Sequence, residues 1–338
     1  MCLRSCGLAC APRSPRDCWY DRGMATAAQR EWMALGYGLF VHFGPWTWSG
    51  SGDGKFPAAR MTAPALDMRA WAALAVESGM RYAVLTAKHV DGFCLWPSAH
   101  TEYSVKATPE RRDWVAEFVA AFREQGLKVG LYYALLDRSC SFFEDDARYA
   151  QYVRDQVTEL LTGYGDILEL WFDGAWDKDH PTRDWPHDPA WDGGTGARWE
   201  WARLYEHIHS MQPNCLVIQN SSSDRPGVPN YLPVDARTSE HYDFIWREQL
   251  CAPRIDPLFP TENGPIYLPL EYCTTLTPGW FWQAGACYSH ASAETIAGWR
   301  RRARAQSANL LLNIGPDITG RIPEYHRSFL IEAERLVR

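Results

Sequence analysis

The residue with the clearest chemical potential is Asp173, which follows an apolar run at residues 167–172 and precedes Gly174. The run is typical of a short buried strand, and the glycine frees the turn after it. In a parallel α/β barrel, side chains at the carboxyl ends of strands contact the substrate, so Asp173 is a candidate for catalysis. An aspartate at a strand end can also cap a helix or a turn, so the assignment depends on the residues that accompany it.

The ends of other predicted strands carry further chemical groups. His42 ends the first strand, His89 and Asp91 end the second, and Tyr132 or Tyr133 ends the third. Histidines with a carboxylate can hold Zn²⁺ in a hydrolase, whereas two carboxylates with histidine, tryptophan and tyrosine are typical of a glycosidase. Barrel metallohydrolases usually carry two histidines close together on the first strand, and His42 stands alone there, so we expect no metal ion.

Hydrophobic periodicity predicts the elements that position these residues. We expect strands at residues 37–43, 81–89, 128–133, 167–172, 215–219 and 309–316. Helices are expected at residues 63–78, 113–125, 145–164, 199–211 and 292–306 and from residue 323. This alternation is typical of an α/β fold with a parallel sheet, and the chain exceeds the roughly 250 residues of a (β/α)8 barrel.

Two stretches do not fit this alternation. Residues 221–270 are rich in proline and poorly periodic, and residues 276–282 form a further aromatic segment. No glycine fingerprint follows the first strand, because Gly44 and Pro45 cannot open a phosphate-binding helix. We therefore expect one TIM-like barrel and no dinucleotide-binding fold.

The composition of the 338 residues limits the class of protein. Hydrophobic residues make up 46% and charged residues 22%, as in an ordinary globular protein. The formal net charge of −7 argues against nucleic acid and against anionic membrane surfaces as partners. The 17 tryptophans favour a carbohydrate site, because indole rings pack on the C–H faces of sugars. Nothing in the sequence predicts an oligomeric state.

The cysteines and the N-terminal residues suggest a cytoplasmic protein. The ten cysteines lack the spacing of a disulfide framework, so we expect free thiols in a reducing compartment. Residues 1–23 lack the apolar core of a signal peptide, and Met24 is a candidate start. We expect residues 1–28 to be an N-terminal extension, either disordered or before the true start, and residues 29–338 to form one catalytic domain.

Several blocks of the sequence together resemble the α-L-fucosidases of glycoside hydrolase family 29. They occur in the family's order along the chain, and their combination is far more specific than any one block. The blocks are LFVHFG (residues 39–44), LTAKHVDGF (85–93), LWPS (95–98), GLKVGLYY (126–133), LWFDG (170–174) and NLLLNIGP (309–316).

The resemblance implies a retaining exo-α-L-fucosidase that acts on terminal fucosyl residues of oligosaccharides or glycoconjugates without a cofactor. It makes Asp173 the nucleophile of a (β/α)8 barrel. His42, His89 and Trp171 match positions that hold fucose hydroxyls or line the sugar pocket, and one of Tyr132 and Tyr133 is expected to join them. The family's C-terminal β-sandwich is not expected here.

The second carboxylate is less well defined by the resemblance. Glu240 is the first choice for the acid/base, because residues 235–240 resemble a segment that carries a catalytic acid in the family. Glu271 is the second choice and Asp224 the third; Asp224 resembles the acid of members that cleave branched α-1,3/1,4-fucosides. Substrate contacts are expected from Arg225 and from Trp282, which lies in the aromatic run at residues 279–282.

Two departures from the family pattern leave alternatives open. Val90 stands where the family usually has the second histidine of a pair, and residues 55–60 lack the family's Glu-Trp-Tyr block. The sugar could therefore be a related 6-deoxy or galacto-configured one. A carbohydrate-binding barrel that has lost activity is a second hypothesis, and a metal-dependent hydrolase is a third.

Overall fold

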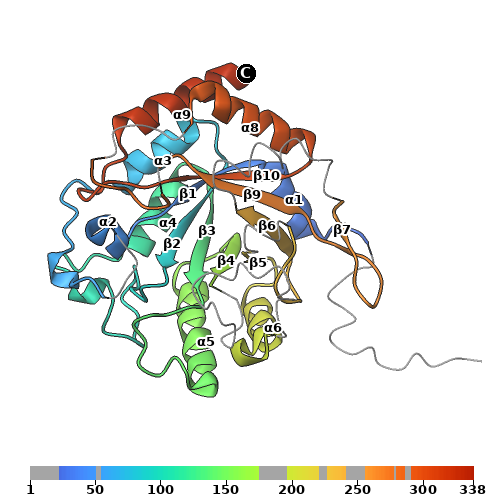
Figure 1. Ribbon diagram of the computed structural model, residues 1–338, viewed down its shortest axis with the longest axis horizontal. Coiled ribbons are helices and arrows are strands. Elements are labelled where there is room, and N and C mark those ends of the chain that lie inside the picture. Colours follow the sequence, from blue (N-terminus) through green and yellow to red (C-terminus); the bar gives the residue numbers. More distant parts are fainter. Residues whose placement is uncertain are drawn as a thin grey trace, which may run out of the picture.

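Eight parallel strands form a closed barrel surrounded by helices (Figure 1). The computed structural model describes residues 23–50, 55–174, 196–220, 227–240, 256–277, 279–285 and 291–338. Around the barrel the strands follow the order β1-β2-β3-β4-β5-β6-β9-β10, and β10 pairs with β1 to close it. Their bounds are β1 Tyr37–Val41, β2 Tyr82–Lys88, β3 Lys128–Ala134, β4 Glu169–Asp173, β5 Leu216–Gln219, β6 Ala236–Glu240, β9 Leu270–Thr275 and β10 Asn309–Ile314.

The outer helices begin where the sequence provides a capping side chain. The carboxylates of Asp67, Asp113 and Asp145 and the hydroxyl of Ser292 each accept a backbone N–H in the first turn of the helix that follows. The helices around the barrel are α3 Met68–Glu77, α4 Trp114–Glu124, α5 Asp146–Gly163, α6 Trp201–Met211, α8 Ala293–Ala305 and α9 Glu324–Val337.

Short elements complete the described ranges. The helix α2 begins at Pro45, whose missing N–H and fixed φ suit the first position of a helix. These elements are α2 Pro45–Ser49, the 3₁₀ turns η2 Ala58–Arg60, η3 Val105–Ala107 and η4 Ala197–Trp199, and the antiparallel pair β7 Leu258–Phe259 and β8 Ile266–Tyr267.

Helix α1 (Ala27–Leu35) covers the N-terminal end of the barrel. Thr26 and Gln29 form a capping box that fixes its first turn, and the Gln29 amide also donates to the backbone oxygen of Asp235 at 2.7 Å. Trp32 is completely buried among side chains inside the barrel, and its indole N–H donates to Glu169 at the start of β4. The amino-terminal end of the barrel is therefore closed by packing and hydrogen bonds.

Six strands and six helices predicted from periodicity are present, which confirms the TIM-like barrel. Two strands of the barrel, β6 and β9, were not predicted, nor was the separate pair of β7 and β8. The sequence of β6 is mostly polar and lies in the poorly periodic stretch, and β9 ends at Thr275, just before the aromatic segment at residues 276–282. The structure thus adds the two strands that close the barrel between β5 and β10.

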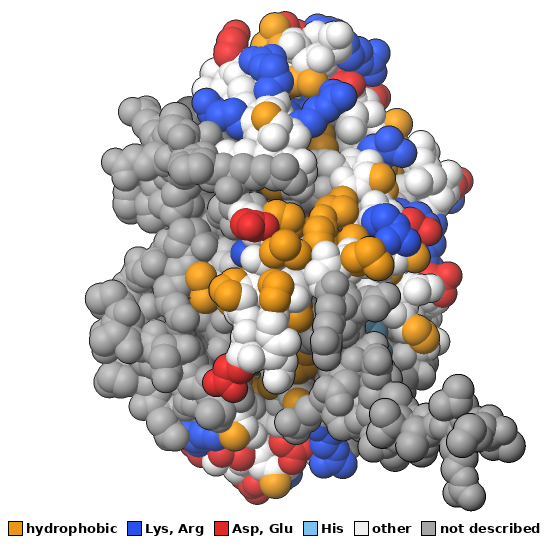
Figure 2. Space-filling model, turned by 90° about the vertical axis from the view of Figure 1, so that its right-hand side faces the viewer, with side chains coloured by type: hydrophobic (Ala, Val, Ile, Leu, Met, Phe, Trp, Pro, Cys, Tyr) orange, Lys and Arg blue, Asp and Glu red, His pale blue; other side chains and the backbone are white. Residues whose placement is uncertain are grey.

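None of the helices in the described ranges has the length and apolar character that a membrane-spanning helix requires. Figure 2 shows the side of the molecule that carries β7. Hydrophobic side chains gather in the middle of this side and border on residues outside the described ranges.

Candidate active site

Alternation along β4 sends three side chains into the barrel at successive heights. Glu169, Trp171 and Asp173 are two residues apart, so they share the inner face of the strand. Glu169 lies at the N-terminal end, Trp171 in the middle and Asp173 at the carboxyl end, where it is half-buried. The predicted position of Asp173 at a strand end is confirmed.

Asp173 is held by a donor from each neighbouring strand. The Tyr132 hydroxyl of β3 donates to Asp173 Oδ2 at 2.6 Å. On the other side, the side-chain amide of Asn220, directly after β5, donates to Asp173 Oδ1 at 3.0 Å. Two donors on opposite sides fix the orientation of this carboxylate.

The same Asn220 nitrogen also donates to Glu240 Oε2 at the end of β6. Two acceptors on one nitrogen bring the nearest oxygens of Asp173 and Glu240 within two hydrogen-bond lengths, or roughly 6 Å. Burial raises the pKa of Glu240 to about 7, and the charge of Asp173 adds to this rise. Hydrogen bonds from Asn220 and Trp280 oppose the rise. The site therefore combines a carboxylate held by two donors with a carboxyl group that keeps its proton near neutral pH.

His42 lies directly after β1, at the same carboxyl end of the barrel. Its Nδ1 lies 2.7 Å from Asn313 Oδ1, and the Asn313 amide donates to the Trp280 backbone oxygen at 2.7 Å and to Thr275 Oγ1 at 2.8 Å. Since the amide nitrogen is used in this way, the Asn313 oxygen accepts from a protonated His42 Nδ1, which leaves His42 Nε2 as an acceptor. Burial lowers the pKa of His42 to about 3, so the ring is neutral.

His89 reaches the pocket because of a β-bulge in β2. The register between β2 and β3 shifts between Thr86 and Lys88, so Lys88 points outward and His89 points inward. The His89 ring stacks on Tyr132 with centroids 5.4 Å apart and an angle of 11° between the planes. Burial and the neighbouring His42 lower the pKa of His89 well below its usual value. His89 Nδ1 and the indole N–H of Trp46, whose ring lies 4.9 Å from His89, are buried without a partner.

Aromatic rings form the rest of the pocket wall. Trp171 stacks on Tyr132 with centroids 5.5 Å apart. The Trp280 ring lies 5.1 Å from His42, and the Phe281 ring lies 5.0 Å from His89. The sequence predicted Trp282 from this run, but Trp280 and Phe281 have the ring contacts with the histidines; Trp282 is half-buried, and its backbone packs against Gly315.

Tyr132 and Tyr133 point to opposite faces of β3. Tyr132 contacts Asp173 inside the barrel, whereas the Tyr133 hydroxyl donates to Gln156 of α5 at 2.7 Å outside it. The Tyr133 hydroxyl also accepts a hydrogen bond from Lys88 Nζ at 3.2 Å. Of the two predicted tyrosines, only Tyr132 reaches the pocket.

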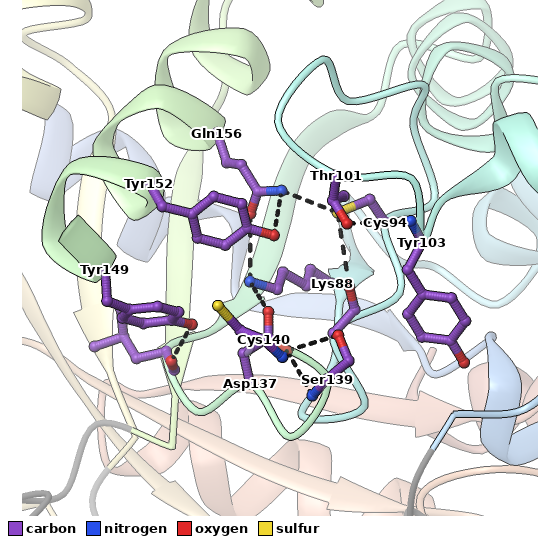
Figure 3. Close-up of polar contacts among 12 residues, drawn as sticks. Lys88, Cys94, Thr101, Tyr103, Asp137, Ser139, Cys140, Tyr149, Tyr152 and Gln156 are labelled. Carbon is purple, nitrogen blue, oxygen red and sulfur yellow. Dashed lines mark hydrogen bonds and ion pairs between the residues drawn. The ribbon is translucent and has the colours of Figure 1, made fainter. Parts of the chain in front are cut away.

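Lys88 lies behind the pocket wall, in a buried polar cluster between the barrel and α5. Its Nζ forms an ion pair with Asp137 Oδ2 at 2.9 Å, and both side chains are completely buried. Figure 3 shows Asp137 on one side of Lys88 and Gln156 and Tyr152 of α5 on the other. Asp137 Oδ1 accepts the backbone N–H groups of Ser139 and Cys140, so the ion pair joins the loop after β3 to the end of β2, next to His89.

Glu271 does not reach the Asp173 and Glu240 pair. It is the second residue of β9, and its side chain accepts hydrogen bonds from the hydroxyl of Tyr82, the first residue of β2, and from the Trp171 indole N–H at 3.1 Å. Burial raises the pKa of Glu271 to about 7. The pKa of Glu169 is raised mainly by burial and further by the charge of Glu271. Glu271 therefore lies one layer below the pocket.

Two predicted residues, Asp224 and Arg225, lie outside the described residues. Val90 is buried in the inner cluster of the barrel, and its backbone oxygen accepts the Arg138 N–H at 2.9 Å. Asn220, Trp280, Phe281 and Trp46 were missed in the sequence. Only the position of Asn220 directly after a predicted strand could have indicated it.

The fold and this pocket define a class of protein. Two carboxylates at strand ends of a (β/α)8 barrel, with neutral histidines and an aromatic wall, are the arrangement of glycoside hydrolases. The α-L-fucosidase family model matches residues 7–335. α-L-fucosidase 1 of Arabidopsis thaliana is 30% identical over 309 residues, which cover 89% of this chain and 58% of the relative.

Solved structures agree with this comparison. α-L-fucosidase isoenzyme 1 from Paenibacillus thiaminolyticus matches with a TM-score of 0.70 and 28% identity, over 92% of this chain and 75% of that chain. A glycoside hydrolase 29 family member from an unknown rumen bacterium matches with a TM-score of 0.73 and 26% identity, over 94% and 58%. The chain belongs to the α-L-fucosidase family, glycoside hydrolase family 29. It spans little more than half the length of the plant relatives it matches.

Proposed function

We propose that this chain is a retaining, exo-acting α-L-fucosidase with Asp173 as nucleophile and Glu240 as acid/base. One observation carries the proposal: a single nitrogen of Asn220 donates to both carboxylates. The separation this allows agrees with the roughly 5–5.5 Å of retaining glycosidases, whereas inverting enzymes need roughly 6.5–9.5 Å to admit a water molecule. The identity of the sugar rests on family membership.

In the first step Asp173 attacks the anomeric carbon of the fucosyl residue. The bond from this carbon to the leaving oxygen breaks, and Glu240 transfers its proton to that oxygen. The product is a fucosyl ester of Asp173, and Glu240 is left as a carboxylate. The pKa of Glu240, raised to about 7, supports this role, because the group must enter the step protonated.

In the second step a water molecule attacks the same carbon. Glu240 takes a proton from the water, the ester bond to Asp173 breaks, and Asp173 leaves as a carboxylate. The neutral rings of His42 and His89 offer hydrogen bonds to sugar hydroxyls, and the aromatic wall offers faces for the sugar's C–H groups. The expected substrates are terminal fucosyl residues of oligosaccharides or glycoconjugates.

The test is hydrolysis of an aryl α-L-fucoside by the wild type and by Asp173→Gly, with and without azide. We expect wild-type turnover, its loss in the variant, and partial recovery with azide, which enters the space left by the carboxylate. Azide on the wild type is the control. Fucose binding without wild-type turnover would favour a binding barrel and contradict the proposal, as would near-normal turnover in Asp173→Gly.

A further inference from the structure

We propose that Asn220 is a catalytic residue of this site, a shared donor that stabilises the negative charge first on Asp173 and then on Glu240. This inference rests on the proposed retaining reaction. It concerns a residue that the sequence blocks did not indicate and that contacts both carboxylates directly.

The amide orientation of Asn220 follows from its surroundings. The ionised nucleophile only accepts hydrogen bonds, so the part of the Asn220 amide that faces Asp173 must be the NH₂ group, whose second hydrogen is available to Glu240. The backbone N–H of Asn220 donates to the Phe172 oxygen at 2.8 Å, and its backbone oxygen accepts from the Asn230 side chain at 3.2 Å. The Asn220 side chain is 8% exposed, so little water competes with it.

Asn220 contacts the two groups between which the negative charge moves during the proposed reaction. Before the first step the negative charge is on Asp173, and Glu240 is protonated. In the fucosyl-enzyme Asp173 is an uncharged ester, and the charge is on Glu240. A fixed amide between them donates to the charged member in both states without moving, which is how preorganised donors stabilise developing charge.

Other groups near Glu240 do not duplicate this contact. Among the described residues, the titratable groups that face it are Asp173 from β4, Tyr132 from β3 and Cys273 from β9. Tyr132 donates to Asp173, and the Cys273 thiol, whose pKa is raised by burial, is neutral. The Trp280 side chain donates its single indole N–H to Glu240. Asn220, by contrast, donates hydrogen bonds to both carboxylates.

The test compares Asn220→Leu and Asn220→Ala with the wild type in pH profiles of kcat/KM. Leucine has the same number and branching of side-chain heavy atoms as asparagine and lacks the donor, whereas alanine removes the whole amide, so a role in donation predicts similar effects for the two variants. We expect kcat/KM to fall on the order of 10- to 100-fold, the usual effect of losing a hydrogen bond to a charged group. The alkaline limb should also move to higher pH, because a bond that favours ionised Glu240 is lost.

Asn309→Ala is the matched control. Asn309 is a buried asparagine on β10 that accepts from the Gly36 N–H and donates to the Trp32 oxygen at the other end of the barrel. It should lower the melting temperature and leave the position of the alkaline limb unchanged. An unchanged limb in a folded, active Asn220→Leu variant would overturn the inference. Absence of wild-type turnover would instead overturn the proposed function.

Discussion

The surroundings of Glu240 act in opposite directions on its pKa. Burial and the charge of Asp173 raise its pKa to about 7, and hydrogen bonds from Asn220 and Trp280 oppose that rise. A general acid must enter the reaction protonated, and Glu240 loses its proton as the pH rises through about 7. We therefore expect kcat/KM to be highest below this pH and to fall above it.

Glu240→Gln should remove this dependence. Glutamine cannot transfer a proton, so turnover of a fucoside with a poor leaving group should fall roughly 10²- to 10⁴-fold. An aryl fucoside with an acidic leaving group needs less protonation and should lose less. The measurement is the pH profile of both substrates in both proteins. An alkaline limb that persists in Glu240→Gln would assign it to another group.

At the level of residues, the sequence predicted those that end an apolar run. Asp173 could be placed because residues 167–172 are apolar except for Glu169 and the turn glycine follows. The position of Asn220 directly after a predicted strand could mark it as a candidate, but its role depends on the strands on either side. Trp280 belongs to the aromatic run from which the sequence indicated only Trp282. Glu271 shows the converse: its raised pKa resembles that of a catalytic acid, yet alternation along β9 places it a layer too low.

At the level of elements, the bulge in β2 determines that His89, and not Lys88, points into the pocket. Strict alternation from Tyr82 and Val84 would send Lys88 into the barrel, and the register shift sends it outward, where Asp137 and α5 bind it. Burial alone would lower the pKa of Lys88, but the charge of Asp137 helps to raise it on balance. The ion pair thus fixes the outward position of Lys88, and His89 is the next residue.

Removing one member of this pair should destabilise the protein strongly. Lys88→Met leaves the Asp137 carboxylate buried without its partner, which costs about 3–5 kcal/mol in comparable cases. The double variant Lys88→Met/Asp137→Leu removes both charges and should recover most of this loss. Denaturant unfolding gives the free energies.

Arg69→Met serves as the control for the ion-pair variants. Arg69 and Glu124 form an ion pair whose side chains are 77% and 56% exposed, so we expect a change of about 0–1 kcal/mol. If Lys88→Met proves as mild as this control, the buried pair does not hold the end of β2.

The strand β6 shows why periodicity alone misses some elements. Its sequence, Ala236–Glu240, has no apolar run, and Arg237 would ordinarily indicate a surface. In the fold, Arg237 is buried and donates to the backbone oxygens of Leu268 at 3.0 Å and Asp256, so loops far along the chain satisfy it. Such partners cannot be read from the strand itself.

At the level of the whole molecule, a chain of contacts inside the barrel connects the closed amino-terminal end to the pocket at the carboxyl end. Trp32 of α1 donates to Glu169, Trp171 donates to Glu271, and the Trp171 ring supports Tyr132, which binds the proposed nucleophile. The barrel class and six of its eight strands could be predicted from the sequence. The register of β4, β5 and β6, whose ends carry Asp173, Asn220 and Glu240, could not be predicted.

The central claim is that Asp173 and Glu240 lie close enough for a reaction through a covalent intermediate. They leave no room between them for the water molecule that a single inverting displacement needs. The most direct measurement is proton NMR of the first fucose released from an aryl α-L-fucoside, recorded before the anomers equilibrate. The account predicts that the α-anomer appears first, as two successive inversions require. If the β-anomer appears first, the reaction is a single displacement, and the assignment of Asp173 as nucleophile is contradicted.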